Sequence, residues 1–212
     1  MNKKYIVFDL DDTLYYELDF LKSAYKEIAD YVSKENSEPV FEKMLNLYYG
    51  KDDVFGFLAS EYNFSKELLL KIYREHIPDI TLRSGVLEVL EHLKQSQIKM
   101  GLLTDGRSLT QRNKIKALQI EDYFDKIIVS EEFGSEKPND NNYKIFMEDD
   151  CEYFYVADNP KKDFIVPNKL GWRTVMIEDD QRKRIHLIPD NLDPKWIAEK
   201  IGSWNYFYNL IK

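Results

Sequence analysis

The chain has 212 residues, of which 43% are apolar and 32% are charged, and its formal net charge is −8. This composition is typical of a soluble globular protein and excludes a disordered or fibrous one. The negative charge argues against a broad surface for nucleic acid or anionic membrane, because both need clustered Lys and Arg residues. Neither a nucleic acid nor a membrane is expected as a partner. If the protein binds a phosphate group, that group should belong to a small molecule.

Two features bear on the location of the protein. No run reaches the ~18 uninterrupted apolar residues of a membrane span. The first apolar run, Tyr5 to Phe8, is interrupted by Asp9 too early for a signal-peptide core. A cytoplasmic location is therefore expected. The single Cys151 can form no internal disulfide and makes a poor zinc site without a second Cys or a nearby His.

Short apolar runs that end in polar or turn residues predict five buried strands. These runs are Tyr5 to Leu10, Lys99 to Thr104, Lys126 to Val129, Tyr153 to Ala157 and Arg173 to Ile177. Helix-like stretches lie between them, and their start signals are Ser108 with Gln111, Pro138, Pro160 and Asp193-Pro194. The alternation predicts a parallel sheet covered on both faces, with the active site at the carboxyl ends of the strands.

The alternation stops between about Tyr15 and Leu82, where only helical patterns occur. A stripe from Leu18 to Val32 has apolar residues at alternating steps of three and four, which predicts a helix. Further helices fit Val40 to Tyr49, Asp53 to Glu61 and Ser65 to His76. The sequence thus predicts an all-helical insertion after the first strand.

The first strand ends in Phe8-Asp9-Leu10-Asp11-Asp12-Thr13, and another carboxylate, Asp158, follows the fourth strand. Two like charges about 4 Å apart repel by roughly 4 kcal/mol at an effective dielectric near 20, so a cation is expected between them. Oxygen ligands without Cys or His favour Mg²⁺ over zinc.

Four motifs in order give the chain its family resemblance. Asp9-Leu10-Asp11-Asp12-Thr13 resembles the first motif of the haloacid dehalogenase-like (HAD) hydrolase superfamily. The other three are Leu102-Leu103-Thr104-Asp105-Gly106, Glu136-Lys137-Pro138 and the segment from Val156 to Asp163. Ala157 departs from the pattern, since many members have Gly before the metal-binding Asp.

The resemblance implies a role for each motif. It implies that Asp9 is the nucleophile, that Asp11 is the acid and base, and that Thr104 hydrogen-bonds the phosphoryl group. Lys137 would neutralise the nucleophile and the phosphoryl group. The implied magnesium ligands are Asp9, Asp158 and Asp11 through its backbone carbonyl, while Asp163 supports Lys137 or a metal-bound water. Phosphate-binding positions would be Thr104, Asp105, Gly106, Arg107 and Lys137.

The same resemblance implies an α/β fold, with a Rossmann-like parallel sheet core and an inserted all-α cap domain. The expected catalytic core comprises residues 1–14 and 83–212, and the expected helical cap comprises residues 15–82. A cap of this size suits a small diffusible substrate, because a lid must shut to exclude water.

The expected activity is Mg²⁺-dependent hydrolysis of a small phosphorylated metabolite through an aspartyl-phosphate on Asp9. The carboxylate of Asp11 argues against the dehalogenases and the ion-pumping ATPases of the superfamily. A phosphatase or a phosphotransferase remains. A non-catalytic regulatory or interaction module on the same fold is the alternative. The protein is expected to be a monomer or a small homo-oligomer.

Other residues near the motifs have ordinary interpretations. Asp12 is expected to cap a turn, and Arg107 could steer an anionic substrate or lie on the surface. His186, like the other two histidines, is expected to be structural or exposed. Of the lysines near the motifs, only Lys137 is expected to face the phosphoryl group, in contrast to Lys161 and Lys162.

Overall fold

A computed structural model describes residues 3–178, 186 and 188–212 of the chain. The chain divides into two compact units. The first comprises Met1–Tyr16, Leu82–Ser108 and Gln119–Lys212, and the second comprises Glu17–Thr81 and Leu109–Leu118. Both units consist of segments that are discontinuous in the sequence.

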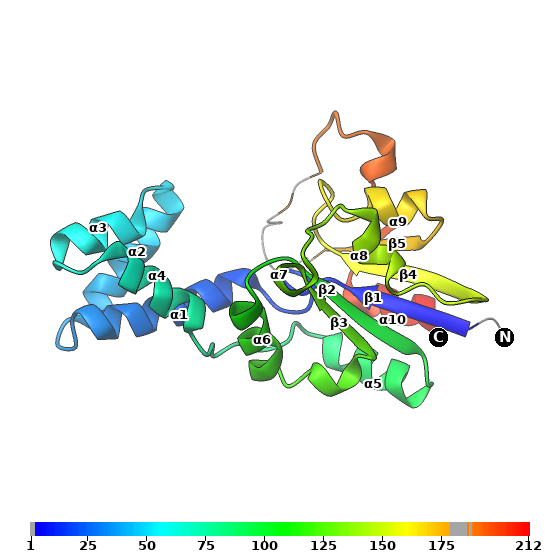
Figure 1. Ribbon diagram of the computed structural model, residues 1–212, viewed down its shortest axis with the longest axis horizontal. Coiled ribbons are helices and arrows are strands. Elements are labelled where there is room, and N and C mark those ends of the chain that lie inside the picture. The colour runs from blue at the N-terminus through cyan, green and yellow to red at the C-terminus, as the bar shows by residue number, and fades with distance from the viewer. Residues whose placement is uncertain (1–2, 179–185, 187) are drawn as a thin grey trace. The chain divides into compact units, whose positions relative to one another are not determined.

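A parallel sheet forms the centre of the first unit (Figure 1). In the described part of the chain it has six strands, in the order β3-β2-β1-β4-β5-β6. These are β1 (Lys3–Phe8), β2 (Lys99–Thr104), β3 (Lys126–Val129), β4 (Cys151–Ala157), β5 (Arg173–Ile177) and β6 (Lys200–Gly202). Phe8 pairs with Leu102 on one side and with Val156 on the other, so the carboxyl ends of β1, β2 and β4 meet at one edge.

Alternation along β1 explains the two cores of this unit. Tyr5 and Val7 join one buried cluster with Tyr143 and Phe146. Tyr143 belongs to a helix on that face, and Phe146 lies two residues after the end of this helix. The next residue, Phe8, packs on Trp204 of the last helix, with ring centroids 6.0 Å apart. The helices of this unit are α5 (Val86–Gln95), α7 (Ser130–Phe133), α8 (Asp140–Lys144), α9 (Ile165–Lys169) and α10 (Trp204–Ile211), with short 3-10 turns at Glu121–Tyr123 and Pro194–Trp196.

The second unit is helical. It contains α1 (Glu17–Val32), α2 (Ser37–Gly50), α3 (Val54–Glu61), α4 (Lys66–Glu75) and most of α6 (Ser108–Ala117). The predicted apolar stripe of α1 is buried in its core, with Leu21, Tyr25 and Ile28 against residues of the next three helices. Asp53 and Ser65 cap α3 and α4 by accepting backbone N–H groups of Gly56 and Leu68.

Side chains of α6 donate hydrogen bonds to the backbone carbonyl groups at the end of α4. Thr110 Oγ1 donates to the carbonyl of Arg74 (2.8 Å), and Asn113 Nδ2 donates to those of Glu75 (3.0 Å) and His76 (3.1 Å). The last carbonyls of a helix have no partner within the helix. Helix α6, which follows β2 in the sequence, therefore supplies hydrogen-bond donors to the end of α4, which precedes β2.

The five predicted strands are confirmed, but three predicted helix starts are wrong. Pro138 precedes α8, which begins at Asp140 with Asn139 as its cap. Pro160 lies in a turn, and α9 begins only at Ile165. Asp193 caps a 3-10 turn of three residues, after which the chain forms β6 before α10.

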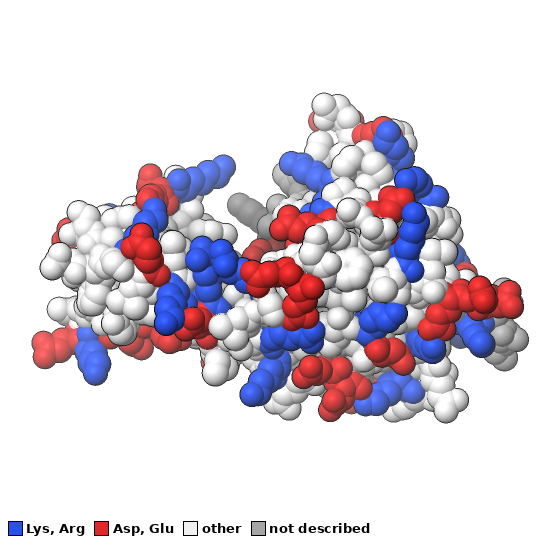
Figure 2. All heavy atoms as spheres, in the orientation of Figure 1, with Lys and Arg blue, Asp and Glu red and all other residues white. Residues whose placement is uncertain are grey.

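None of the helices in the described part of the chain is both long and apolar enough to span a bilayer. On the face drawn in Figure 2, acidic and basic side chains of the described residues are intermingled.

Gly101 is a position where the sheet and a side chain lie very close together. A Cβ atom on Gly101 in β2 would lie 2.5 Å from Cε1 and 2.7 Å from Cδ1 of the buried Phe146. We expect Gly101→Ala to lower the free energy of unfolding by about 1–3 kcal/mol through overpacking, measured by urea denaturation. The same change in a Phe146→Leu background should cost less. An equal cost in both backgrounds would contradict this explanation.

Candidate active site

The nucleophile candidate lies where β1 ends. The N–H of Asp9 donates to the carbonyl of Val156 in β4 (2.9 Å), which continues the ladder by one residue. The chain then turns, with the N–H of Leu14 bonded to the carbonyl of Leu10 (2.9 Å) and Asp12 in the left-handed region at φ 55°. Asp tolerates this conformation better than most residues, so Asp12 is a turn residue as expected. The turn leaves Asp9 buried at the carboxyl edge of the sheet.

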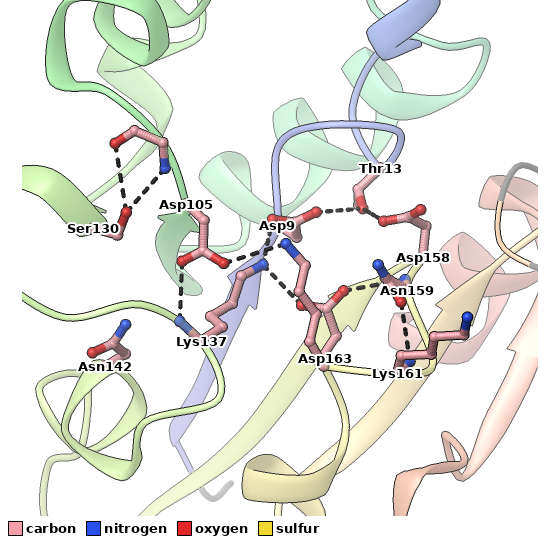
Figure 3. A network of polar contacts seen from close by, with 12 residues as sticks. Asp9, Thr13, Asp105, Ser130, Lys137, Asn142, Asp158, Asn159, Lys161 and Asp163 are labelled. Carbon is pink, nitrogen blue, oxygen red and sulfur yellow. Dashed lines mark hydrogen bonds and ion pairs between the residues drawn. The ribbon is translucent and has the colours of Figure 1, made fainter. Parts of the chain in front are cut away.

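Lys137 holds the Asp9 carboxylate in place. Its Nζ lies 2.6 Å from Asp9 Oδ1 and 2.8 Å from Asp163 Oδ1, and it also donates to Tyr155 Oη (3.2 Å). Figure 3 shows Lys137 reaching between Asp9 and Asp163. The Lys137 side chain is fully buried, so these are strong charge-assisted contacts rather than surface ion pairs.

Thr13 links the two carboxylates proposed as metal ligands. Its Oγ1 lies 3.1 Å from Asp9 Oδ2 and 3.2 Å from Asp158 Oδ1 (Figure 3). A hydroxyl has one proton to donate, so it can serve only one of these oxygens at a time. The two carboxylates thus lie close together with too few donors to compensate both charges.

The pKa values reflect this crowding. Burial raises the pKa of Asp9 to about 6, although Lys137 opposes the shift. Burial, followed by the charge of Asp9, raises the pKa of Asp158 well above its usual range. Burial favours the neutral amine of Lys137, but Asp163 and Asp9 outweigh it and hold its pKa well above the usual value. Lys137 therefore stays charged, and the carboxylates resist ionisation without a further cation.

Residues of the second motif lie at the same carboxyl edge of the sheet. Thr104 ends β2 and is buried. Asp105 accepts the backbone N–H of Lys137 at Oδ1 (3.0 Å) and the Nζ of Lys162 at Oδ2 (3.2 Å). The N–H of Gly106 donates to Ser130 Oγ (2.9 Å). The side chains and main chain of this motif thus tie together three loops of the site.

Two of the expected site residues point to other partners. Arg107 lies 3.9 Å from Glu131 and its side chain is 58% exposed, so it forms a surface ion pair. The Asp11 carboxylate accepts a hydrogen bond from the hydroxyl of the buried Tyr15. The structure thus gathers Asp9, Lys137, Asp158 and Asp163 into one cluster, while the Asp11 side chain is held by its own turn.

Three side chains that contribute to the site were not predicted from the sequence. Tyr155 contacts both Lys137 and Asp163, Ser130 supports Gly106, and Thr13 bridges two carboxylates. A weak signal existed only for Tyr155, a residue with a hydroxyl in an otherwise apolar strand.

His186 was expected to be structural or exposed. Its Nε2 lies 3.4 Å from Asp158 Oδ2 and 4.0 Å from Asp12 Oδ2, so it lies beside the acidic cluster. Burial lowers the pKa of His186, which favours a neutral imidazole.

The residues present fit a magnesium ion. Carboxylate oxygens of Asp9, Asp158 and Asp163 lie within 4.8 Å of one another, and all three residues are buried. If all three were ionised, they would carry three negative charges against the one positive charge of Lys137. Asp163 already accepts hydrogen bonds from Lys137 at Oδ1 and from the Asn159 N–H at Oδ2 (3.1 Å). Thr13 can donate to only one of Asp9 Oδ2 and Asp158 Oδ1 at a time, whereas each oxygen of Asp163 has a donor of its own. Oxygen atoms of Asp9 and Asp158 are therefore more available to a cation, and hard oxygen donors are what Mg²⁺ prefers.

Comparison with known proteins shows the family of the chain. Residues 6–177 match the haloacid dehalogenase-like hydrolase family. The chain belongs to this family. It is 31% identical to a glyceraldehyde 3-phosphate phosphatase of Methanocaldococcus jannaschii, over 99% of this chain and 97% of the relative. It is 25% identical to the pyrimidine 5'-nucleotidase YjjG of Escherichia coli, over 55% of this chain and 52% of that protein.

Among solved structures, the HAD-type protein YfnB from Bacillus subtilis matches with a TM-score of 0.71 at 18% identity, covering 100% of both chains. This likeness confirms the Rossmann-like α/β fold. Family membership and the phosphatase relatives together identify the chain as a HAD-like phosphatase.

The buried carboxylates predict a stability cost in the absence of metal. With chelator present, we expect Asp158→Asn to be more stable than the wild type at pH 8, by at least about 1 kcal/mol or roughly 2–4 °C in Tm. The Asp158 pKa is raised on folding, so ionisation destabilises the wild type progressively as pH rises above the unfolded value, whereas Asn does not titrate.

The measurement is thermal unfolding of both proteins at pH 5 and pH 8. The difference should be larger at pH 8, and added Mg²⁺ should stabilise the wild type more than the variant. A variant that is less stable than the wild type at both pH values would contradict this account of the cluster.

Proposed function

We propose that the protein is a magnesium-dependent phosphomonoester hydrolase that forms an aspartyl-phosphate on Asp9 and acts on a small phosphorylated metabolite. The main support is the Asp9 carboxylate, which is buried at the end of β1 and held at Oδ1 by Lys137 and at Oδ2 by Thr13. A nucleophile fixed at both oxygens loses little orientational freedom when it reacts.

In the proposed reaction, an Asp9 oxygen attacks the phosphorus and the bond to the ester oxygen breaks. Asp11, once its carboxyl group has left the Tyr15 hydroxyl, gives a proton to the leaving alcohol and then takes one from the water that hydrolyses the phosphoenzyme. Lys137 keeps its charge beside Asp9 throughout, and Thr104 hydrogen-bonds the phosphoryl group. Mg²⁺, held by Asp9, Asp158 and the backbone carbonyl of Asp11, would supply positive charge to the transferred group.

The relatives suggest which metabolites to test first. The Methanocaldococcus jannaschii relative, which aligns over nearly the whole chain, is named for glyceraldehyde 3-phosphate, and the Escherichia coli relative for pyrimidine 5'-nucleotides. We propose a triose phosphate as the first substrate candidate. Product analysis with an added alcohol acceptor separates a phosphatase from a phosphotransferase.

We also propose that the helical unit serves as a cap domain, because its main segment is inserted between β1 and β2 in the chain. A cytoplasmic location and a monomeric or small homo-oligomeric state stay predictions.

Covalent trapping tests the nucleophile. With Mg²⁺ and a ³²P-labelled phosphomonoester, acid quenching should give a labelled wild-type protein, and Asp9→Asn should give none because an amide is not a nucleophile. Excess chelator should abolish labelling of the wild type. Asp140→Asn, at a partly exposed position paired with Lys144 and Lys169, is the matched control and should label normally. Labelling of Asp9→Asn would overturn the proposed function.

The role of Asp11 predicts a dependence on the leaving group. Asp11→Asn keeps the nucleophile but removes the proton donor, so single-turnover phosphorylation by an alkyl phosphate should slow by about 10²-fold or more. Phosphorylation by an aryl phosphate, whose leaving group needs less protonation, should slow much less. Equal losses for both esters, measured by rapid quench, would exclude Asp11 as the general acid.

A further inference from the structure

The hydrogen-bonding capacity of Lys137 is fully used within the protein. An ammonium group has three N–H donors. The Nζ of Lys137 donates to Asp9, Asp163 and Tyr155 at 2.6, 2.8 and 3.2 Å. Its side chain has no solvent exposure. Lys137 therefore has no N–H left for a phosphoryl oxygen unless one of these three contacts breaks.

Lys162 is a second ammonium group at the same site, with donors to spare. In the described part of the chain its Nζ has a single hydrogen-bond partner, Asp105 Oδ2 at 3.2 Å. Two N–H groups are then available. The Lys162 side chain is 39% exposed, in contrast to the buried Lys137, so an incoming ligand can reach it.

The charge of Lys162 acts on the nucleophile. It lies close enough to lower the pKa of Asp9, and Asp9, Asp163 and Asp105 in turn hold the pKa of Lys162 above its usual value despite burial and the repulsion of Lys137. Lys162 is therefore protonated at neutral pH. Asp105 also accepts the backbone N–H of Lys137, which fixes the two lysines relative to each other.

We propose that Lys162 supplies ammonium N–H groups that bind non-bridging oxygens of the substrate's phosphoryl group, in addition to the charge of Lys137, which holds and neutralises Asp9. This assignment rests on the proposed function. It differs from the expectation that only Lys137 faces the phosphoryl group. It also gives different roles to the neighbouring Lys161 and Lys162. Figure 3 shows the Lys161 side chain directed away from Asp9, and Lys161 is exposed.

Binding of orthophosphate tests the assignment with the Mg²⁺-loaded protein. We expect Lys162→Met to raise both the KM for a phosphomonoester and the competitive inhibition constant of orthophosphate by about 10- to 100-fold, the usual effect of a charged hydrogen bond. Lys162→Arg should recover part of the loss. Lys161→Met, the matched control, should change both constants by less than about twofold.

The rival explanation is that Lys162 only neutralises Asp105. In that case the double variant Asp105→Asn/Lys162→Met would regain the wild-type constants, whereas phosphate binding by Lys162 itself predicts that the loss persists. Wild-type constants in the double variant, or in Lys162→Met alone, would overturn the proposal. Calorimetric titration of the folded variants with orthophosphate gives the same comparison even if no phosphomonoester is turned over. An inactive wild type would overturn the proposed function without deciding the role of Lys162.

Discussion

The contact of the Lys137 ammonium group with Asp9 and Asp163 is the interaction on which the site depends. It balances part of a buried negative cluster, at 2.6 and 2.8 Å from the two carboxylates, and it joins three separate parts of the chain. Removing one partner from a buried ion pair leaves an uncompensated charge, which is far more costly than losing a surface pair. The fold supports this contact by bringing the ends of β1 and β4 together through direct pairing of the two strands. The pairing that forms this edge of the sheet therefore also fixes the position of Asp9.

The remaining negative charge links stability to metal binding. Asp158 is forced beside Asp9 and Thr13, where no lysine contacts it directly among the described residues. A divalent cation would therefore bind the folded chain more tightly than the unfolded one and stabilise it by mass action. The cluster expected to destabilise the metal-free protein is the same one that is proposed to hold a hard cation.

Much of the fold could be predicted because its strands are buried on both sides and appear as continuous apolar runs. β6 could not, since Lys200–Gly202 has one apolar residue and is too short for a pattern. Proline signals were misleading where they marked turns: after Asp193 the chain forms only a 3-10 turn. In the site, residue types at strand ends predicted that Asp9 and Asp158 lie close together, as the structure shows. The contacts of Thr13, Tyr155 and Lys162 depend on how the turns after the strands are folded, which no local pattern encodes.

The hydrogen bonds from Thr110 and Asn113 to the end of α4 have a consequence for how the molecule can be divided. A fragment limited to residues 17–81 would lack both side chains, and the carbonyls of Arg74, Glu75 and His76 would lose these donors. Lys114, whose Nζ lies 4.5 Å from the ring centre of Phe20, would be missing as well. The helical segment could therefore be transferred to another sheet only together with α6, so residues 17–81 are not a self-contained unit.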